Sequence, residues 1–83
     1  MKFIMHNYLR NFLDPKDFHI DIYDRSIHIT NYNKIITLGT AKIIIEAPLK
    51  KITLCGSNFS LNKLADKELL ISGKLDSLEI KHE

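Results

Sequence analysis

Residues 49–80 read LKKITLCGSNFSLNKLADKELLISGKLDSLEI, and this stretch decides the fold. A strand-like apolar run leads into a lone glycine twice, in residues 52–55 before Gly56 and in residues 69–72 before Gly73. Apolar side chains at a period of two are typical of a β-strand with one buried face. A glycine between such runs lets the backbone bend, bulge or take a positive φ that a branched residue would resist. The stretch therefore predicts strands rather than helices.

The chain is short and rich in isoleucine, which limits it to one small domain. Its 83 residues, 45% of them hydrophobic, are enough for a single core. Isoleucine favours strands because its branched Cβ is stiff at χ1. The formal net charge of +2 is too small to indicate a polyanionic partner. The lysines are spread over predicted strands and turns, and only Phe59 stands among them as an aromatic residue, so nucleic acid is not the expected partner.

Eight short strands are predicted after residue 17, and we expect an all-β fold. They are residues 18–23, 27–30, 34–39, 41–46, 49–55, 58–63, 68–72 and 75–81. Tight turns join them, including one at Asn31, because asparagine tolerates a left-handed φ. Regularly spaced short strands predict a curled antiparallel meander or sandwich. The alternative is a solenoid-like stack of short strands with glycine corners.

The first 17 residues differ in pattern from the β domain of residues 18–83. Met5, Leu9 and Phe12 recur at helical spacing, and Pro15 ends the pattern in a turn. We expect a short amphipathic helix that docks on its own sheet or, alternatively, on a partner or a membrane surface. No run approaches the roughly 18 apolar residues of a membrane span, and the start lacks the features of a signal peptide. The sequence thus predicts a cytoplasmic protein.

Three strands carry apolar residues on both faces and predict an additional buried surface. Apolar residues are adjacent at 35–36, 43–45 and 69–70. We take Ile36, Ile44 and Leu70 from these runs as candidate interface residues. A half-solvated sheet would not favour apolar side chains on its second face. We expect these residues to be buried between the layers of a sandwich or paired in a homo-oligomer. In the second case, a charge at Ile36 or Ile44 would break assembly and leave a folded monomer.

No combination of residues indicates enzyme chemistry. The four histidines match no zinc spacing, and the single cysteine, Cys55, excludes the common structural zinc sites. The carboxylates are not paired for acid–base work, and the isolated glycines form no phosphate-binding loop. One cysteine allows no internal disulfide, which fits a reducing compartment, and we expect it to be a small buried residue. We predict no catalytic, cofactor-binding or metal-binding residues and no small-molecule substrate.

Three motifs in the sequence occur in one order in a known family. Residues 31–35 read NYNKI, residues 54–61 read LCGSNFSL, and residues 71–80 read ISGKLDSLEI. They resemble, in turn, the "I-E-N-Y-K-G-I" turn, the "apolar-x-G-x-x-L-x-I" segment and the "I-x-G-x-I-x-x-L-x-F" ending of the YabP/YqfC family of small sporulation proteins. Residues 13–17, LDPKD, are similar to the "L-P-K-D" of the YqfC branch. The resemblance covers most of the chain and is closer to that branch.

The resemblance implies a non-enzymatic protein of endospore formation. Such proteins act in spore coat or cortex morphogenesis, at the mother-cell or forespore membrane surface. A membrane-associated sporulation partner similar to YqfD is implied as well. No catalytic residue is carried over from the family. Asn31, Gly56 and Gly73, which stand in the three motifs, are expected to be structural turn positions.

Two classes of function remain open from the sequence. The first is a structural or interaction module that assembles with itself or a partner through exposed strand edges. The second is a small β-barrel that binds single-stranded nucleic acid or an anionic surface through its lysines. Because phosphate binding releases counterions, steep weakening with salt would distinguish the second class.

Overall fold

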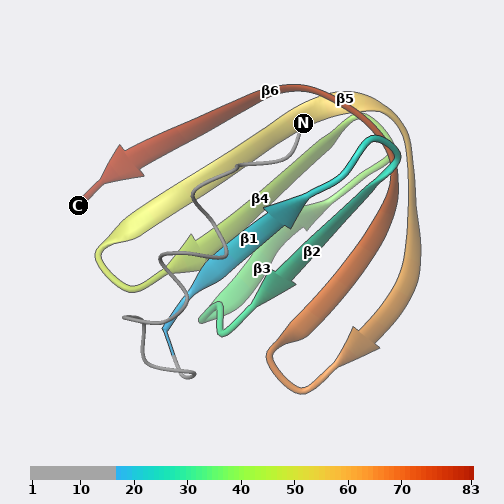
Figure 1. The fold of residues 1–83 in the computed structure, drawn as a ribbon. Coiled ribbons are helices and arrows are strands. Elements are labelled where there is room, and N and C mark those ends of the chain that lie inside the picture. Colours follow the sequence, from blue (N-terminus) through green and yellow to red (C-terminus); the bar gives the residue numbers. More distant parts are fainter. Residues whose placement is uncertain (1–16) are drawn as a thin grey trace.

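The computed structural model describes residues 17–83, which form strands and no helix. The strands are β1 (His19–Ile22), β2 (Ser26–Thr30), β3 (Lys34–Leu38), β4 (Lys42–Ala47), β5 (Lys50–Ala65) and β6 (Glu68–His82) (Figure 1). The prediction of an all-β fold is confirmed. The helix predicted in the first 17 residues lies outside the described residues, apart from Asp17.

The six strands form one antiparallel sheet in the order β1-β2-β6-β5-β4-β3. Strands β3 to β6 are neighbours in chain order, whereas the β1–β2 hairpin is added beside β6. The chain therefore crosses after β2, which lies second in the sheet, to β3 at the opposite edge. The sheet is open and is neither closed nor curled into a barrel. The expected curled meander or sandwich of eight strands is corrected to a single sheet of six, and no solenoid-like stack forms.

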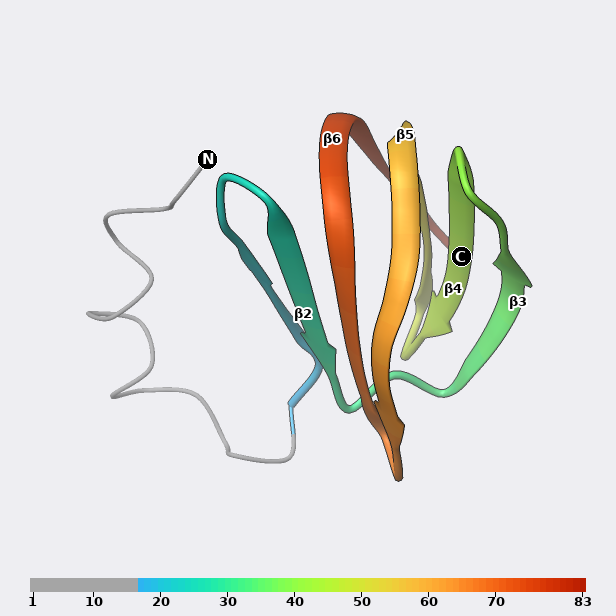
Figure 2. The same ribbon diagram turned by 90° about the vertical axis from the view of Figure 1, so that its right-hand side faces the viewer.

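Eight predicted strands become six because two glycines do not end a strand. The runs at 49–55 and 58–63 both belong to the 16-residue β5, and those at 68–72 and 75–81 belong to the 15-residue β6. Both long strands bend midway, so that the two halves of the sheet face each other (Figures 1 and 2). The register between β5 and β6 shifts next to Gly56. A shift of this kind is typical of a β-bulge, which lets a pleated strand bend.

The bend is packed around Phe59, whose side chain is only 5% exposed. Gly73 has a φ of 135°, and a Cβ there would lie 2.8 Å from both the Asn58 carbonyl oxygen and Phe59 Cδ1. A Cβ on Gly56 would overlap the Lys74 carbonyl oxygen and lie 2.7 Å from Phe59 Cζ. Both positions therefore require glycine, because the two backbones and the ring approach too closely for another side chain.

One face of the bent sheet forms the core. Its fully buried side chains, each at most 1% exposed, are Ile27, Ile29, Ile43, Ile45, Ile52, Leu54, Leu69 and Ile71. They occur at every second position because successive side chains of a strand point to opposite faces. Strands β2 and β4 are separated in the sheet by β6 and β5, yet their isoleucines belong to the same cluster. The bend is what brings them together.

Three connections of the described sheet contain a residue at positive φ: Asn31 after β2, Leu49 after β4 and Lys67 after β5. Asn31 has a φ of 62°, and its N–H donates to the Lys67 carbonyl oxygen at 2.7 Å, which joins the β2–β3 connection to the β5–β6 hairpin. Leu49 has a φ of 61° and follows Pro48 in the two-residue turn between β4 and β5. Proline followed by a residue at positive φ is the pattern of a type II turn, which prefers glycine or asparagine over leucine.

Adding a methyl group at the bend should destabilise the fold. We expect Gly56→Ala and Gly73→Ala each to lower the free energy of unfolding by about 2–4 kcal/mol, measured by urea unfolding. Gly39→Ala is the matched control, because its Cβ would meet only the Lys42 carbonyl oxygen at 3.2 Å. It should cost less than about 1 kcal/mol. Equal losses at all three positions would contradict the importance of the bend.

Relieving the strained turn should stabilise the protein. Leu49 is 78% exposed, so its replacement removes little packing. We expect Leu49→Asn to raise the free energy of unfolding by about 0.5–1 kcal/mol, because asparagine adopts a left-handed φ at lower cost. Leu49→Val, which adds a branched Cβ at the same φ, should lower it. Thermal unfolding measures both, and an asparagine variant less stable than the original chain would refute this account of the turn.

Candidate functional site

The three apolar positions predicted as an interface do not form one surface. Ile36 is 44% exposed and lies at the bulge in the edge strand β3. Ile44 is partly buried on the outer face of β4, because Ile43 and Ile45 on either side point into the core. Leu70 is partly buried on β6, where that strand pairs with β2. Ile36 and Ile44 thus lie on neighbouring strands, and Leu70 lies on the other half of the sheet.

Cys55 is partly buried, which corrects the expectation of a buried thiol. It follows the buried Leu54, so its side chain lies on the outer face, in register with Lys42 and Ser77. Within residues 17–83, no group of three or more His, Cys, Asp or Glu side chains could hold a metal ion. The same residues contain no helix of the length and hydropathy needed to cross a membrane.

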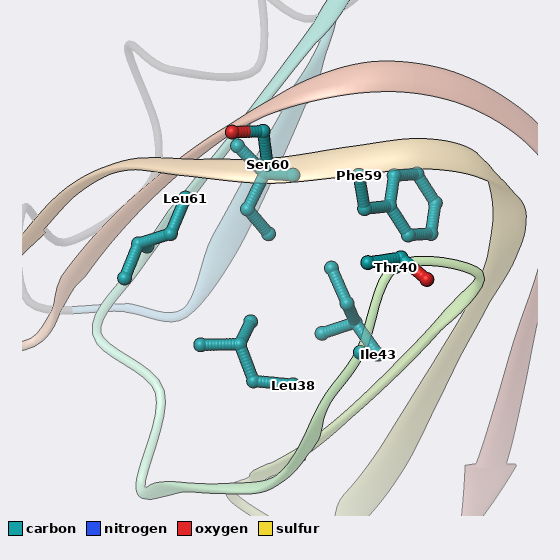
Figure 3. A pocket seen from close by; sticks show the side chains of 8 residues that line it. Leu38, Thr40, Ile43, Phe59, Ser60 and Leu61 are labelled. Atoms are coloured by element: carbon teal, nitrogen blue, oxygen red, sulfur yellow. The ribbon is translucent and has the colours of Figure 1, made fainter.

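A hollow of about 200 Å³ opens between β3 and the second half of β5 (Figure 3). Its floor reaches the core, since the lining residues Ile43, Phe59 and Ile71 are 0–5% exposed. Leu38 of β3 and Leu61 of β5 form its walls and are 43% and 44% exposed. Gly39, Thr40 and Ser60 complete the lining. The hollow is thus an apolar surface that continues from solvent into the core.

Backbone hydrogen bonds hold one end of the hollow together. The Gly56 N–H donates to the Ala41 carbonyl oxygen at 3.0 Å, and the Phe59 N–H donates to the Thr40 carbonyl oxygen at 2.9 Å. These bonds tie the β3–β4 turn to the bend in β5. Beyond Phe59, β5 pairs with β6, and β3 pairs with β4. The two strands that flank the hollow therefore do not pair with each other.

The second half of β5 is a strand edge with exposed leucines. Residues 57–65 have β6 on one side and no described strand on the other. Leu61 and Leu64 lie opposite Ile71 and Leu69, so they point to the core face, yet they are 44% and 57% exposed. An unpaired edge is a template for another strand, and clustered exposed apolar side chains mark interaction sites.

A charged cluster on the outer face joins three strands. Glu68 of β6 accepts a hydrogen bond from Lys63 Nζ of β5 at 2.7 Å and one from His28 Nε2 of β2 at 3.1 Å. The Lys63 hydrogen bond, followed by that of His28, lowers the pKa of Glu68 below its ordinary value of 4.5. The cluster is open to solvent, so it stabilises these strand pairings only modestly.

The pKa of Glu68 gives a test of this cluster. Because the folded pKa is lowered, ionised Glu68 stabilises the fold above pH 4.5, and this contribution is lost as the pH falls through the folded pKa. We expect Lys63→Met to raise the pKa of Glu68 toward 4.5, measured by NMR titration of the carboxyl carbon. Lys42→Met, on the other half of the sheet, should leave it unchanged. If the pKa of Glu68 is unchanged in Lys63→Met, the hydrogen bond from Lys63 is not what lowers it.

The hollow was not predicted from the sequence. The available signal was the pair Leu61, which ends the second motif, and Leu64 shortly after it; in the sequence both resemble core residues. Their exposure depends on where the pairing of β4 with β5 ends, and that is a property of the bend. Comparison of the chain with protein-family models, with curated proteins and with solved structures gives no match. A proposal on function therefore depends on the geometry of residues 17–83.

Proposed function

We propose that this protein is a non-enzymatic interaction module that binds an extended apolar segment of a partner protein in the hollow between β3 and β5. The proposal depends on one observation: Leu38, Leu61 and Leu64 are 43–57% exposed beside strand edges with which no described strand pairs. An added strand satisfies the free N–H and C=O groups of an edge, and its alternate side chains fill apolar sites. A hollow continuous with the core offers such a site.

The resemblance to the YabP/YqfC family supports a place for this module in spore coat or cortex morphogenesis. Its partner there would be a membrane-associated protein similar to YqfD, met at the mother-cell or forespore membrane surface. The second motif, residues 54–61, contains Gly56 at the bend and also Phe59 and Leu61 in the hollow. The residues that carry the resemblance thus build the fold and contribute to the proposed site.

Binding of single-stranded nucleic acid or an anionic surface has less support. That alternative requires a small β-barrel, whereas the sheet is open. Phe59 is 5% exposed and therefore cannot stack on a base. Lys34, Lys51 and Lys81 lie in one row across the outer face, but Glu46 lies in the same row. Binding of single-stranded DNA that weakens steeply with salt would favour this alternative.

Leu61→Glu should disrupt the proposed site. The probe is a phage-displayed library of random linear peptides selected on the immobilised full chain, and we expect alternating apolar and polar residues in the peptides that bind. A carboxylate in the hollow would lose water on binding, so affinity for Leu61→Glu should fall at least about tenfold in fluorescence polarisation. Leu49→Glu, at the β4–β5 turn outside the hollow lining, is the matched control and should bind normally.

The two parts of the proposal can fail separately. Selected peptides that bind Leu61→Glu as tightly as the original chain would refute the hollow as the binding site. The role in spore formation is tested by deleting the gene in its host and examining spores by electron microscopy. Spores with normal coat and cortex would refute that role alone.

A further inference from the structure

Among residues 17–83, the second half of β6 is a free sheet edge separate from the hollow. Residues 74–82 pair with β5 and with no other described strand. From Ser77 to His82 their register with β5 has no shift. The other edges are short or irregular: β1 has four residues, β3 contains a bulge, and the end of β5 contains register shifts. Short strands and bulges protect an edge from pairing, and this part of β6 has neither.

The direction of the free backbone groups follows from the register. The Glu83 N–H donates to the Leu49 carbonyl oxygen at 3.0 Å. In an antiparallel pair every second residue exchanges hydrogen bonds with the neighbouring strand, so the odd-numbered residues of this part of β6 bond to β5. The even-numbered residues direct N–H and C=O to the side where no described strand lies. These residues are Leu78, Ile80 and His82.

The side chains at this edge are complementary to themselves. Ile80 is 49% exposed, and it lies between Glu79 and Lys81 in the sequence. We propose that the second half of β6 pairs with the same strand of a second copy of this chain, antiparallel and centred on Ile80. The result is a symmetric dimer with a continuous sheet across the two copies. In Figure 1 this part of β6 runs along the outer side of the sheet.

This pairing uses the outward-facing backbone groups of Leu78, Ile80 and His82. Ile80 lies opposite its own copy, and Leu78 lies opposite His82 of the other copy on each side, so three pairs exchange two hydrogen bonds each. Glu79 then lies opposite Lys81 twice, in the non-hydrogen-bonded positions where cross-strand side chains are closest. A symmetric dimer requires such a self-complementary surface.

Other registers lose these interactions. Centring on Glu79 would place two carboxylates directly opposite each other, which is destabilising. Centring on Leu78 would place Glu79 opposite Ser77 and would form no ion pair. The dimer does not depend on the hollow or on its occupant, because Ile71 is the one lining residue on β6 and it lies in the first half of that strand, before the bend.

Charge reversal with rescue tests the dimer on the full chain. Sedimentation equilibrium should show a dimer for the original sequence and a dissociation constant at least about tenfold higher for Glu79→Lys, in which lysines face each other twice. The double variant Glu79→Lys with Lys81→Glu should restore the original constant, because the pairs are only exchanged. A monomeric original chain at about 1 mM, or a double variant as weak as the single one, would overturn the proposal.

A second pair of variants tests the backbone ladder. Ile80→Pro removes an N–H that points away from β5, so it should abolish dimerisation while circular dichroism shows a folded chain. Ile80→Thr keeps the N–H and should still dimerise. Dimerisation by the proline variant would overturn the proposal. Leu61→Glu should leave the dimer intact and Glu79→Lys should leave peptide binding intact, so failure of this proposal is distinguishable from failure of the hollow.

Discussion

The rest of the structure depends on the close approach of β5 and β6 around Phe59. Glycine at positions 56 and 73 lets the two backbones and the ring meet where any side chain would collide. Both strands bend there together, since they are paired on either side of the bend. The bend turns one open sheet into two facing halves, and isoleucines from β2 and β4 then bury each other. In a sheet without the bend these residues would face solvent on one large surface.

The same bend creates the free edges. Strand β4 pairs with β5 only up to the bend, and β2 pairs with β6 only on the other side of it, so each long strand has one half with a single neighbour among the described strands. These two half-edges differ in chemistry. The half of β5 is irregular and displays leucines beside a hollow, whereas the half of β6 is regular and alternates apolar and charged side chains. A strand edge recognises another polypeptide through its backbone, so neither surface requires a catalytic group.

The two faces of the sheet differ in polarity because successive side chains of a strand point to opposite faces. The core face has almost no polar side chains, and the described residues contain no buried polar or charged residue. The outer face has lysines, the cluster of Glu68 and the thiol of Cys55, none of which is enclosed. This arrangement favours interaction through apolar surface and backbone groups over chemistry in an enclosed polar site.

The sequence by itself determined the β class and which side chains share a face of each strand, because alternation along a strand is a local property: Ile43 and Ile45 are buried while Ile44, between them, is only partly buried. It also marked Gly56, Gly73 and Asn31 as special backbone positions. It did not determine that each glycine bends a strand, since glycine permits a turn and a bend equally and only the packing against Phe59 selects between them. Four features follow from that selection: the number of strands, the place of the β1–β2 hairpin beside β6, the hollow, and the free edge around Ile80. They depend on contacts between residues far apart in the chain, which only the tertiary structure decided.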